Sequence, residues 1–99
     1  MNVLEQTMTE DDLLVAIVEA ARFLGWRVHH DRRSDKAIQQ GDAGFPDLVM
    51  ARHGHVLFWE LKGSRGQLTT EQWGWLQALG HAGKVIRPAD LDAALAALA

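Results

Sequence analysis

The sequence predicts an α/β domain in which a mixed four-stranded sheet is flanked by helices. Stretches near both ends carry apolar residues at the three- and four-residue intervals of amphipathic helices, whereas the middle carries short apolar runs around a glycine turn, as in a β-hairpin. We expect a first helix, a three-stranded meander, a crossover helix, a fourth strand parallel to the third, and a final helix.

The length and composition favour one small folded domain. The chain has 99 residues, of which 47% are apolar, and this suits residues 9–99 as a single domain behind a flexible N-terminus at residues 1–8. There is no cysteine, so disulfides and thiolate metal sites are excluded. No apolar run approaches the ~20 residues of a membrane span, and the first residues do not resemble a signal peptide. These features favour a cytoplasmic protein.

The first helix and strand have clear boundary signals. Thr9 can cap a helix whose first turn is acidic, which suits the helix dipole. The apolar stripe predicts a helix over Glu10–Leu24 that ends at Gly25. Trp26–His30 then reads as the first strand, and the polar segment Asp31–Ala43 as a loop.

A hairpin should follow this loop. The apolar runs Leu48–Ala51 and Val56–Leu61 are separated by Arg52-His53-Gly54-His55, which is typical of a turn. Zinc binding by the two histidines of this turn is an alternative, but the turn lacks the further ligands that zinc needs.

The second half of the chain predicts a helix, a strand and a helix. Thr69 and Gln72 form a capping-box pattern before a helix over Thr70–Ala82, which Gly83 should end. We expect a strand at Lys84–Arg87 and a last helix at Ala89–Leu98. In the crossover helix, we expect Trp73, Leu76 and Leu79 to face the core. Trp75 is predicted to contact a partner instead.

Three charged residues stand where the hairpin would otherwise be apolar. Side chains alternate along a strand, so Glu60 and Lys62 share one face. Asp47 starts the partner strand and can lie beside Glu60. Two carboxylates can hold Mg²⁺, which acidifies a bound water and offsets phosphate charge, and a lysine can orient that water. The alternative is a cross-strand salt bridge on a solvated sheet face.

The motif around these residues resembles a nuclease signature. Pro46-Asp47 followed by Glu60-Leu61-Lys62 looks like the PD-(D/E)xK motif. The longer string from Gly44 to Gln72 resembles the VRR-NUC branch, which includes small stand-alone phage and bacterial proteins and is similar to archaeal Holliday junction resolvases. The resemblance covers about Glu10 to Leu98 and implies a restriction-endonuclease-like core.

The resemblance also implies roles for individual residues. Asp47 and Glu60 would bind Mg²⁺ or Mn²⁺ together with the Leu61 backbone carbonyl, and Lys62 would position or activate water. Gln72 has two competing interpretations, a reciprocal helix cap or an active-site amide near the scissile phosphate; we favour the active site.

Relatives often add a glutamate from the first helix as a metal ligand. Glu10 extends the predicted buried stripe that includes Leu13 and Ile17, whereas Glu19 points almost the other way. We therefore favour Glu10 as the helical ligand, with a plain first-turn acid as the alternative and Glu19 as the second choice.

The charge distribution bears on the partner. The net charge of −3 argues against non-specific nucleic-acid binding, yet most basic residues fall between residues 26 and 66. Within that segment we expect a DNA-facing group: Arg32, Arg33, Lys36 and Arg65. Interspersed surface charge is the alternative.

Together, these features predict a metal-dependent DNA endonuclease. The resemblance implies hydrolysis to a 5′-phosphate without a covalent intermediate, in a bacterial or phage-infected host cell. Similar stand-alone proteins act as dimers, and exposed tryptophans also favour a homodimer, so the resemblance implies Holliday junctions or flaps as substrates; simple nicking and an accessory role in phage recombination are further alternatives. The alternatives are a non-catalytic DNA-binding module and a protein-interaction domain that keep the nuclease fold. In two respects the chain departs from the family pattern: the fourth strand is short, and Trp73 stands where a basic residue often follows the helix-start glutamine.

Overall fold

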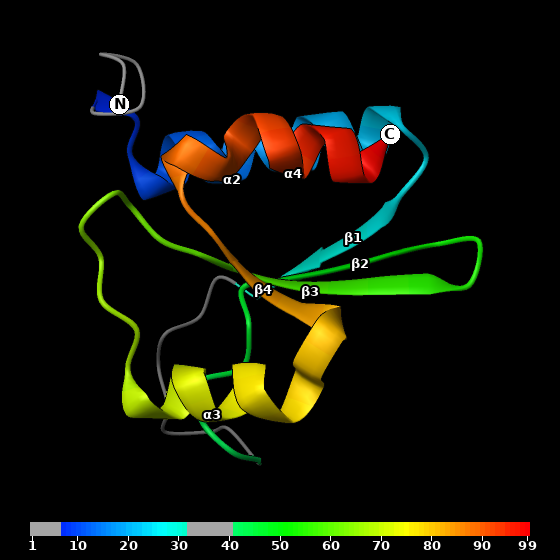
Figure 1. Ribbon diagram of the computed structural model, residues 1–99. Helices are drawn as coiled ribbons and strands as arrows, with labels where there is room; N and C mark the ends of the chain where they lie inside the picture. Colours follow the sequence, from blue (N-terminus) through cyan, green and yellow to red (C-terminus); the bar gives the residue numbers. More distant parts are fainter. Residues whose placement is uncertain (1–6, 32–40) are drawn as a thin grey trace.

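The protein is a mixed α/β domain with a four-stranded mixed sheet between helices. The computed structural model describes residues 7–31 and 41–99. The strands lie in the order β1-β2-β3-β4, with the first two pairings antiparallel and the last parallel. One face of the sheet is covered by two helices and the other face by one (Figure 1). The elements are β1 (Arg27–His30), β2 (Leu48–Arg52), β3 (His55–Leu61), β4 (Gly83–Ile86), α2 (Glu10–Phe23), α3 (Thr70–Leu79) and α4 (Leu91–Leu98).

Helix α2 forms as its sequence predicts. The Thr9 hydroxyl accepts a hydrogen bond from the Asp12 amide while the Asp12 carboxylate accepts one from the Thr9 amide, so two free helix-end N–H groups are satisfied. Leu24 is the C-cap, and Gly25 follows with φ +89°, a conformation that favours glycine. The predicted helix is therefore one residue too long.

The hairpin has the predicted register because its turn is short. His53 and Gly54 both have positive φ, 53° and 83°, as a two-residue type I′ turn requires. This turn pairs Arg52 with His55 and Leu48 with Trp59. The predicted strands were each one residue too short at the turn.

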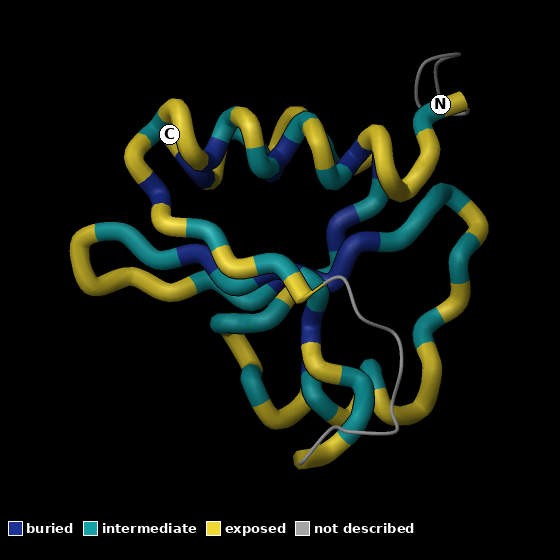
Figure 2. The backbone as a smooth tube through the Cα atoms, turned by 180° about the vertical axis from the view of Figure 1, so that it is seen from behind, coloured by how far each residue is buried: buried dark blue, intermediate teal, exposed yellow. Residues whose placement is uncertain are grey.

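The main core lies between the sheet and the pair α2 and α4. The buried residues gather where these helices meet the sheet (Figure 2). Trp26 joins the two ends of the domain, because its indole N–H donates a buried 2.9 Å hydrogen bond to the Leu98 carbonyl. The core cluster is Leu13, Ile17, Ala21, Trp26, Leu48, Met50, Trp59, Leu61, Ile86, Ala94 and Leu98.

The second half differs from prediction at its helix ends. Helix α3 stops at Leu79, with Gly80 (φ +59°) as its C-cap, and a 3₁₀ turn, Gly80–Ala82, leads into β4. The predicted end at Gly83 was therefore wrong, because Gly80 already takes the left-handed conformation. The predicted last helix divides into a 3₁₀ turn, Pro88–Asp90, and α4.

The buried face of α3 is rotated from the predicted stripe. Trp73, predicted in the core, is 55% exposed. Trp75, predicted as a partner contact, is half-buried; its indole N–H donates to the Asp42 carbonyl at 3.1 Å, and its ring packs edge-on against Phe45 at 4.9 Å. Phe45 packs in turn on Phe58 of β3. These rings fix which side of α3 faces the sheet.

Two predicted features fall largely outside the described residues. The flexible N-terminus predicted for residues 1–8 lies mostly in residues 1–6, and the predicted loop Asp31–Ala43 mostly in residues 32–40. In the part of the chain that the structure describes, every helix is too short or too polar to cross a membrane.

Candidate active site

Asp47 and Glu60 meet at one end of the sheet. Asp47 lies one residue before β2, and the pairing of Leu48 with Trp59 puts the next pair, Asp47 and Glu60, opposite each other on one face. The Asp47 Oδ2 atom accepts a 2.9 Å hydrogen bond from the Leu61 amide, which fixes the carboxylate at the start of β2. The geometric expectation that the hairpin brings these two acids together is met.

Glu60 is buried, with only 2% of its surface exposed. Its strand lies between β2 and β4, and its contact with Gln72 puts the side chain on the face of the sheet that α3 covers. Its Oε2 accepts a 3.1 Å hydrogen bond from the Gln72 amide and lies 4.0 Å from the Lys62 ammonium. Among the described residues, the buried Oε1 has no hydrogen-bond donor. A buried carboxylate oxygen without a donor is unfavourable, and a bound proton or a cation would satisfy it.

The environment of Glu60 disfavours its ionised form. The pKa of Glu60 is raised to about 8, chiefly by burial and next by the nearby Asp47 charge. The Asp47 carboxyl group also favours the protonated form as a hydrogen-bonding neighbour, the Lys62 charge lowers the pKa, and the Glu10 charge raises it slightly. At neutral pH the site therefore holds a proton on Glu60 or attracts a cation that replaces it.

Gln72 caps α3 and also contacts Glu60, while its role at a scissile phosphate stays a prediction. Its Oε1 accepts a 3.0 Å hydrogen bond from the Thr69 amide, completing the capping box, and its Nε2 donates to Glu60. The predicted competition was wrong because the two ends of one amide side chain can face different partners.

Gly44 sets how closely the first turn of α3 approaches the motif. It has φ +92°, and a Cβ atom at this position would lie 2.5 Å from the Glu71 carbonyl carbon and 2.7 Å from the Gln72 amide nitrogen. Only glycine allows this approach, so Gly44 positions the turn from which Gln72 reaches Glu60.

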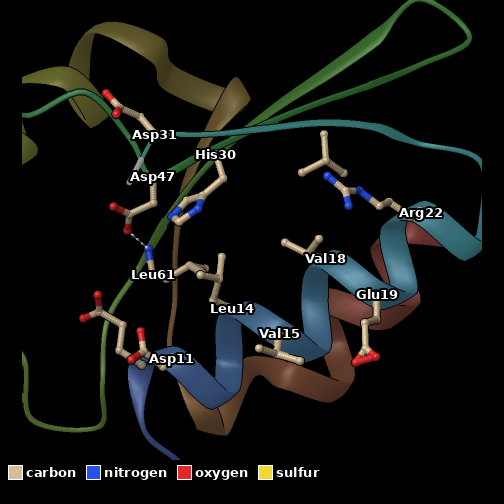
Figure 3. A pocket seen from close by; sticks show the side chains of 12 residues that line it. Asp11, Leu14, Val15, Val18, Glu19, Arg22, His30, Asp31, Asp47 and Leu61 are labelled. Carbon is tan, nitrogen blue, oxygen red and sulfur yellow. Dashed lines mark hydrogen bonds between the residues drawn. The ribbon is translucent and has the colours of Figure 1, made fainter. Parts of the chain in front are cut away.

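Glu10 and Glu19, the two candidate ligands of α2, lie on a groove beside the Asp47–Glu60 pair. A cavity of about 870 Å³ runs between α2 and β1 and reaches Asp47 and Leu61 at one end. His30 extends into this groove from β1, whereas Glu19 lies at the far end from Asp47 (Figure 3). Glu10 also lines the groove, but it is exposed and does not extend the buried stripe as predicted.

The carboxylate oxygens of Asp47 and Glu60 suit a cation that keeps part of its water shell. Two facing carboxylates, one with a buried oxygen that lacks a donor, are oxygen ligands of the type that Mg²⁺ and Mn²⁺ accept. Within residues 7–31 and 41–99, no group of three or more His, Cys, Asp or Glu side chains is arranged to hold a metal ion. Glu10 is thus not assembled with the pair, and a role as ligand stays a prediction; the zinc alternative at His53 and His55 gains no support.

The predicted DNA-facing residues are only partly visible. Arg32, Arg33 and Lys36 lie outside the described residues, and Arg65 is exposed in the segment between β3 and α3. Arg52, another basic residue of the central segment, has a structural role instead. It donates hydrogen bonds to the Leu24 and Ala99 carbonyls at 2.8 and 3.2 Å, and its guanidinium group lies over the Trp26 ring.

Sequence reasoning missed Arg87. Its Nη1 donates to the carbonyls of Gly63 and Gly66 at 2.9 and 2.7 Å, so it fixes the segment that follows Lys62. The bonds span 24 and 21 residues, and no local pattern around Arg87 signals them.

The comparisons with known proteins add no family. No family model, curated protein or solved structure matches the chain.

Proposed function

We propose that this chain is a metal-dependent DNA endonuclease with a restriction-endonuclease-like core, of the VRR-NUC branch of PD-(D/E)xK nucleases. One observation carries the proposal: the facing carboxyl groups of Asp47 and Glu60, with a buried oxygen of Glu60 that lacks a donor, stand beside Lys62. Holding two acids together in a buried place costs stability, which a structural role alone does not require.

The cation site would consist of oxygen atoms. Asp47, Glu60 and the Leu61 carbonyl would hold Mg²⁺ or Mn²⁺, and Glu10 would join them if its exposed side chain turned toward the pair. When bound, such an ion supplies Lewis acidity for a phosphate oxygen and lowers the pKa of a water ligand.

The remaining side chains position the reactants. Lys62, half-buried beside Glu60, orients the attacking water and neutralises charge that develops on the phosphate. Gln72 holds the Glu60 carboxylate in place and supports the phosphate. Attack in line with the leaving 3′ oxygen gives a 5′-phosphate, and the chain forms no covalent bond to DNA.

The substrate and assembly follow from the size of the domain. One small domain offers little surface for gripping branched DNA, whereas a two-fold homodimer would present two sites to two strands. Holliday junctions or flaps are therefore the proposed substrates, and the cytoplasm of a bacterial or phage-infected cell the proposed location.

A non-catalytic DNA-binding or protein-interaction module is the second candidate. It is favoured by the structural contacts that the same residues make: Asp47 accepts from the Leu61 amide, and Gln72 caps α3. In that case the acids would only stabilise the fold.

Cleavage of labelled DNA separates these candidates. The protein is incubated with a four-way junction, a flap and a linear duplex, with Mn²⁺, Mg²⁺ or chelator. We expect cleavage that needs the metal and is abolished by Glu60→Gln, while folding and DNA binding persist. Glu71→Gln, which removes an exposed acid of α3, is the matched control and should cut normally. Equal cutting by Glu60→Gln and the parent would refute the mechanism.

A further inference from the structure

Trp73 differs from the other three tryptophans of the chain. Trp26 and Trp59 are 6% and 2% exposed, and Trp75 is hydrogen-bonded and packed on Phe45. Trp73 is 55% exposed and packs against no aromatic ring of the described residues. The Trp73 indole is too exposed to contribute much to the stability of the fold. A binding role would instead explain a large aromatic side chain at this position.

Trp73 lines an open hollow of about 410 Å³. Leu68 is the other apolar residue of its lining, and the polar residues are Gln67, Thr69, Thr70 and Arg87. A flat apolar face beside hydrogen-bonding groups is the combination that a nucleobase requires, since its faces stack and its edges donate and accept.

The hollow adjoins the carboxylate cluster. Trp73 follows Gln72, whose amide lies 3.1 Å from Glu60. The segment from Gly63 to Leu68 leads from Lys62 to the hollow, and Arg87 holds its carbonyls in place. Arg87 is the one charged residue among those that line the hollow in the described part of the chain. Lys62 and Arg65 lie in or next to the segment that leads to it, so a phosphate backbone can find positive charge here in spite of the exposed Glu71 on α3.

We infer that Trp73 stacks on an unpaired nucleobase of a DNA strand bound at the Asp47–Glu60 site. This inference rests on the proposed function. The base must be unpaired, because within a duplex both of its faces are covered by its neighbours. A single exposed indole is too small to dominate a protein interface, which buries about 800 Å² on each partner.

The test measures binding rather than cleavage. In the Glu60→Gln background with Mg²⁺, fluorescence anisotropy reports the affinity for a labelled short oligothymidine and for a blunt duplex of equal length. Trp73→Ala should weaken oligothymidine binding by about 5- to 100-fold, the range of one base–aromatic stack. Trp73→Phe should keep most of the affinity. Phe23→Ala, at an aromatic residue that is 90% exposed at the end of α2, is the matched control and should change nothing. Blunt-duplex affinity should change by less than about twofold with each variant.

Several outcomes would overturn the inference. The first is failure of the protein to bind oligothymidine. The second is an unchanged affinity in Trp73→Ala, and the third is an equal loss for oligothymidine and duplex. If Trp73→Ala instead converts a dimer to a monomer without changing oligothymidine affinity, Trp73 is a contact between copies and the inference is wrong. Absence of cleavage by the parent, with the stacking effect intact, would refute the proposed nuclease and leave the base site standing.

Discussion

The two sides of the Asp47–Glu60 pair differ in charge. On the α2 side, the groove is lined by four acids besides Asp47 and by one arginine; the acids are Glu10, Asp11, Glu19 and Asp31. On the α3 side, the charges are mixed: Lys62 lies 4.0 Å from Glu60 and Arg87 holds the segment after it, while Glu71 and Asp90 are nearby acids, and Trp73 stands exposed. The acidic side strengthens the attraction of the pair for a cation, whereas the α3 side carries the lysine and arginine that a phosphate backbone would need. Under the proposed function, DNA would therefore approach from the α3 side.

After the loss of Glu60, loss of the lysine should cause the largest fall in cleavage. Lys62→Met removes the only positive side chain that lies within 4.0 Å of Glu60 among the described residues. We expect cleavage to fall about 100- to 1,000-fold, the range seen when one group that stabilises transition-state charge is removed. Single-turnover cleavage of a labelled junction measures it.

The control for this lysine is Lys84→Met, at an exposed position on β4, which should cut within about twofold of the parent. If both variants cut equally well, the α3 side does not contribute to the chemistry.

The raised pKa of Glu60 predicts a pH-dependent stability without metal. In the unfolded chain the Glu60 carboxyl group has its ordinary pKa of 4.5, so the folded protein binds the proton more tightly. The free energy of unfolding should therefore fall as the pH rises from 4.5 to about 8 and then level off. At ~1.4 kcal/mol for each pH unit, the fall should reach a few kcal/mol. Urea unfolding in chelator measures it.

Glu60→Gln isolates this effect, because glutamine cannot ionise. The difference in stability between parent and variant should change across this pH range; a constant difference would contradict the prediction. Added Mg²⁺ should restore stability at pH 8 in the parent alone, since a cation bound to the pair relieves the cost of ionising Glu60.

The approach of α3 to the motif can be broken at Gly44. In Gly44→Ala, the new Cβ meets the backbone of Glu71 and Gln72 while φ stays positive, so the first turn of α3 must move away. We expect a loss of about 1–3 kcal/mol in unfolding free energy and about tenfold in cleavage. Thermal unfolding and cleavage assays measure these losses.

Gly74→Ala provides the comparison, because Gly74 lies within α3 and a Cβ there meets nothing within 4 Å. This variant should be more stable than the parent by up to about 1 kcal/mol. Equal effects of the two substitutions would exclude a special role for the contact at Gly44.

The hairpin was predictable from sequence, as were the start and capping box of α3, whereas the face that α3 turns to the sheet was not. A two-residue turn at His53 and Gly54 fixes the register of both strands, and the register alone puts Asp47 opposite Glu60. Helix α3, in contrast, has apolar residues on more than one side. Its orientation is decided by the rings of Phe45 and Phe58, which belong to other parts of the chain.

The charged residues also divide into those placed by local sequence pattern and those placed by contacts distant in sequence. Glu60 and Lys62 share a face through strand alternation, which any reader of the sequence can derive. The partners of Arg52 and Arg87 are backbone carbonyls far along the chain. Such contacts depend on the finished fold, because every residue carries a carbonyl and composition cannot select one.

The smallest expected effect is that of removing one acid from the α2 side of the Asp47–Glu60 pair. Glu10 is exposed on the groove, yet its charge reaches Glu60, whereas Glu19 lies at the far end from Asp47. Glu10→Gln should therefore raise the Mg²⁺ concentration needed for half-maximal cleavage by about 3- to 10-fold, the effect of a partly screened charge. Glu19→Gln, the matched loss of one charge from the same helix, should change it by less than about twofold. Titration of cleavage with Mg²⁺ gives both values. An equal shift in the two variants would mean that the groove acts only through its summed charge, and a shift in neither would separate the α2 side from cation binding altogether.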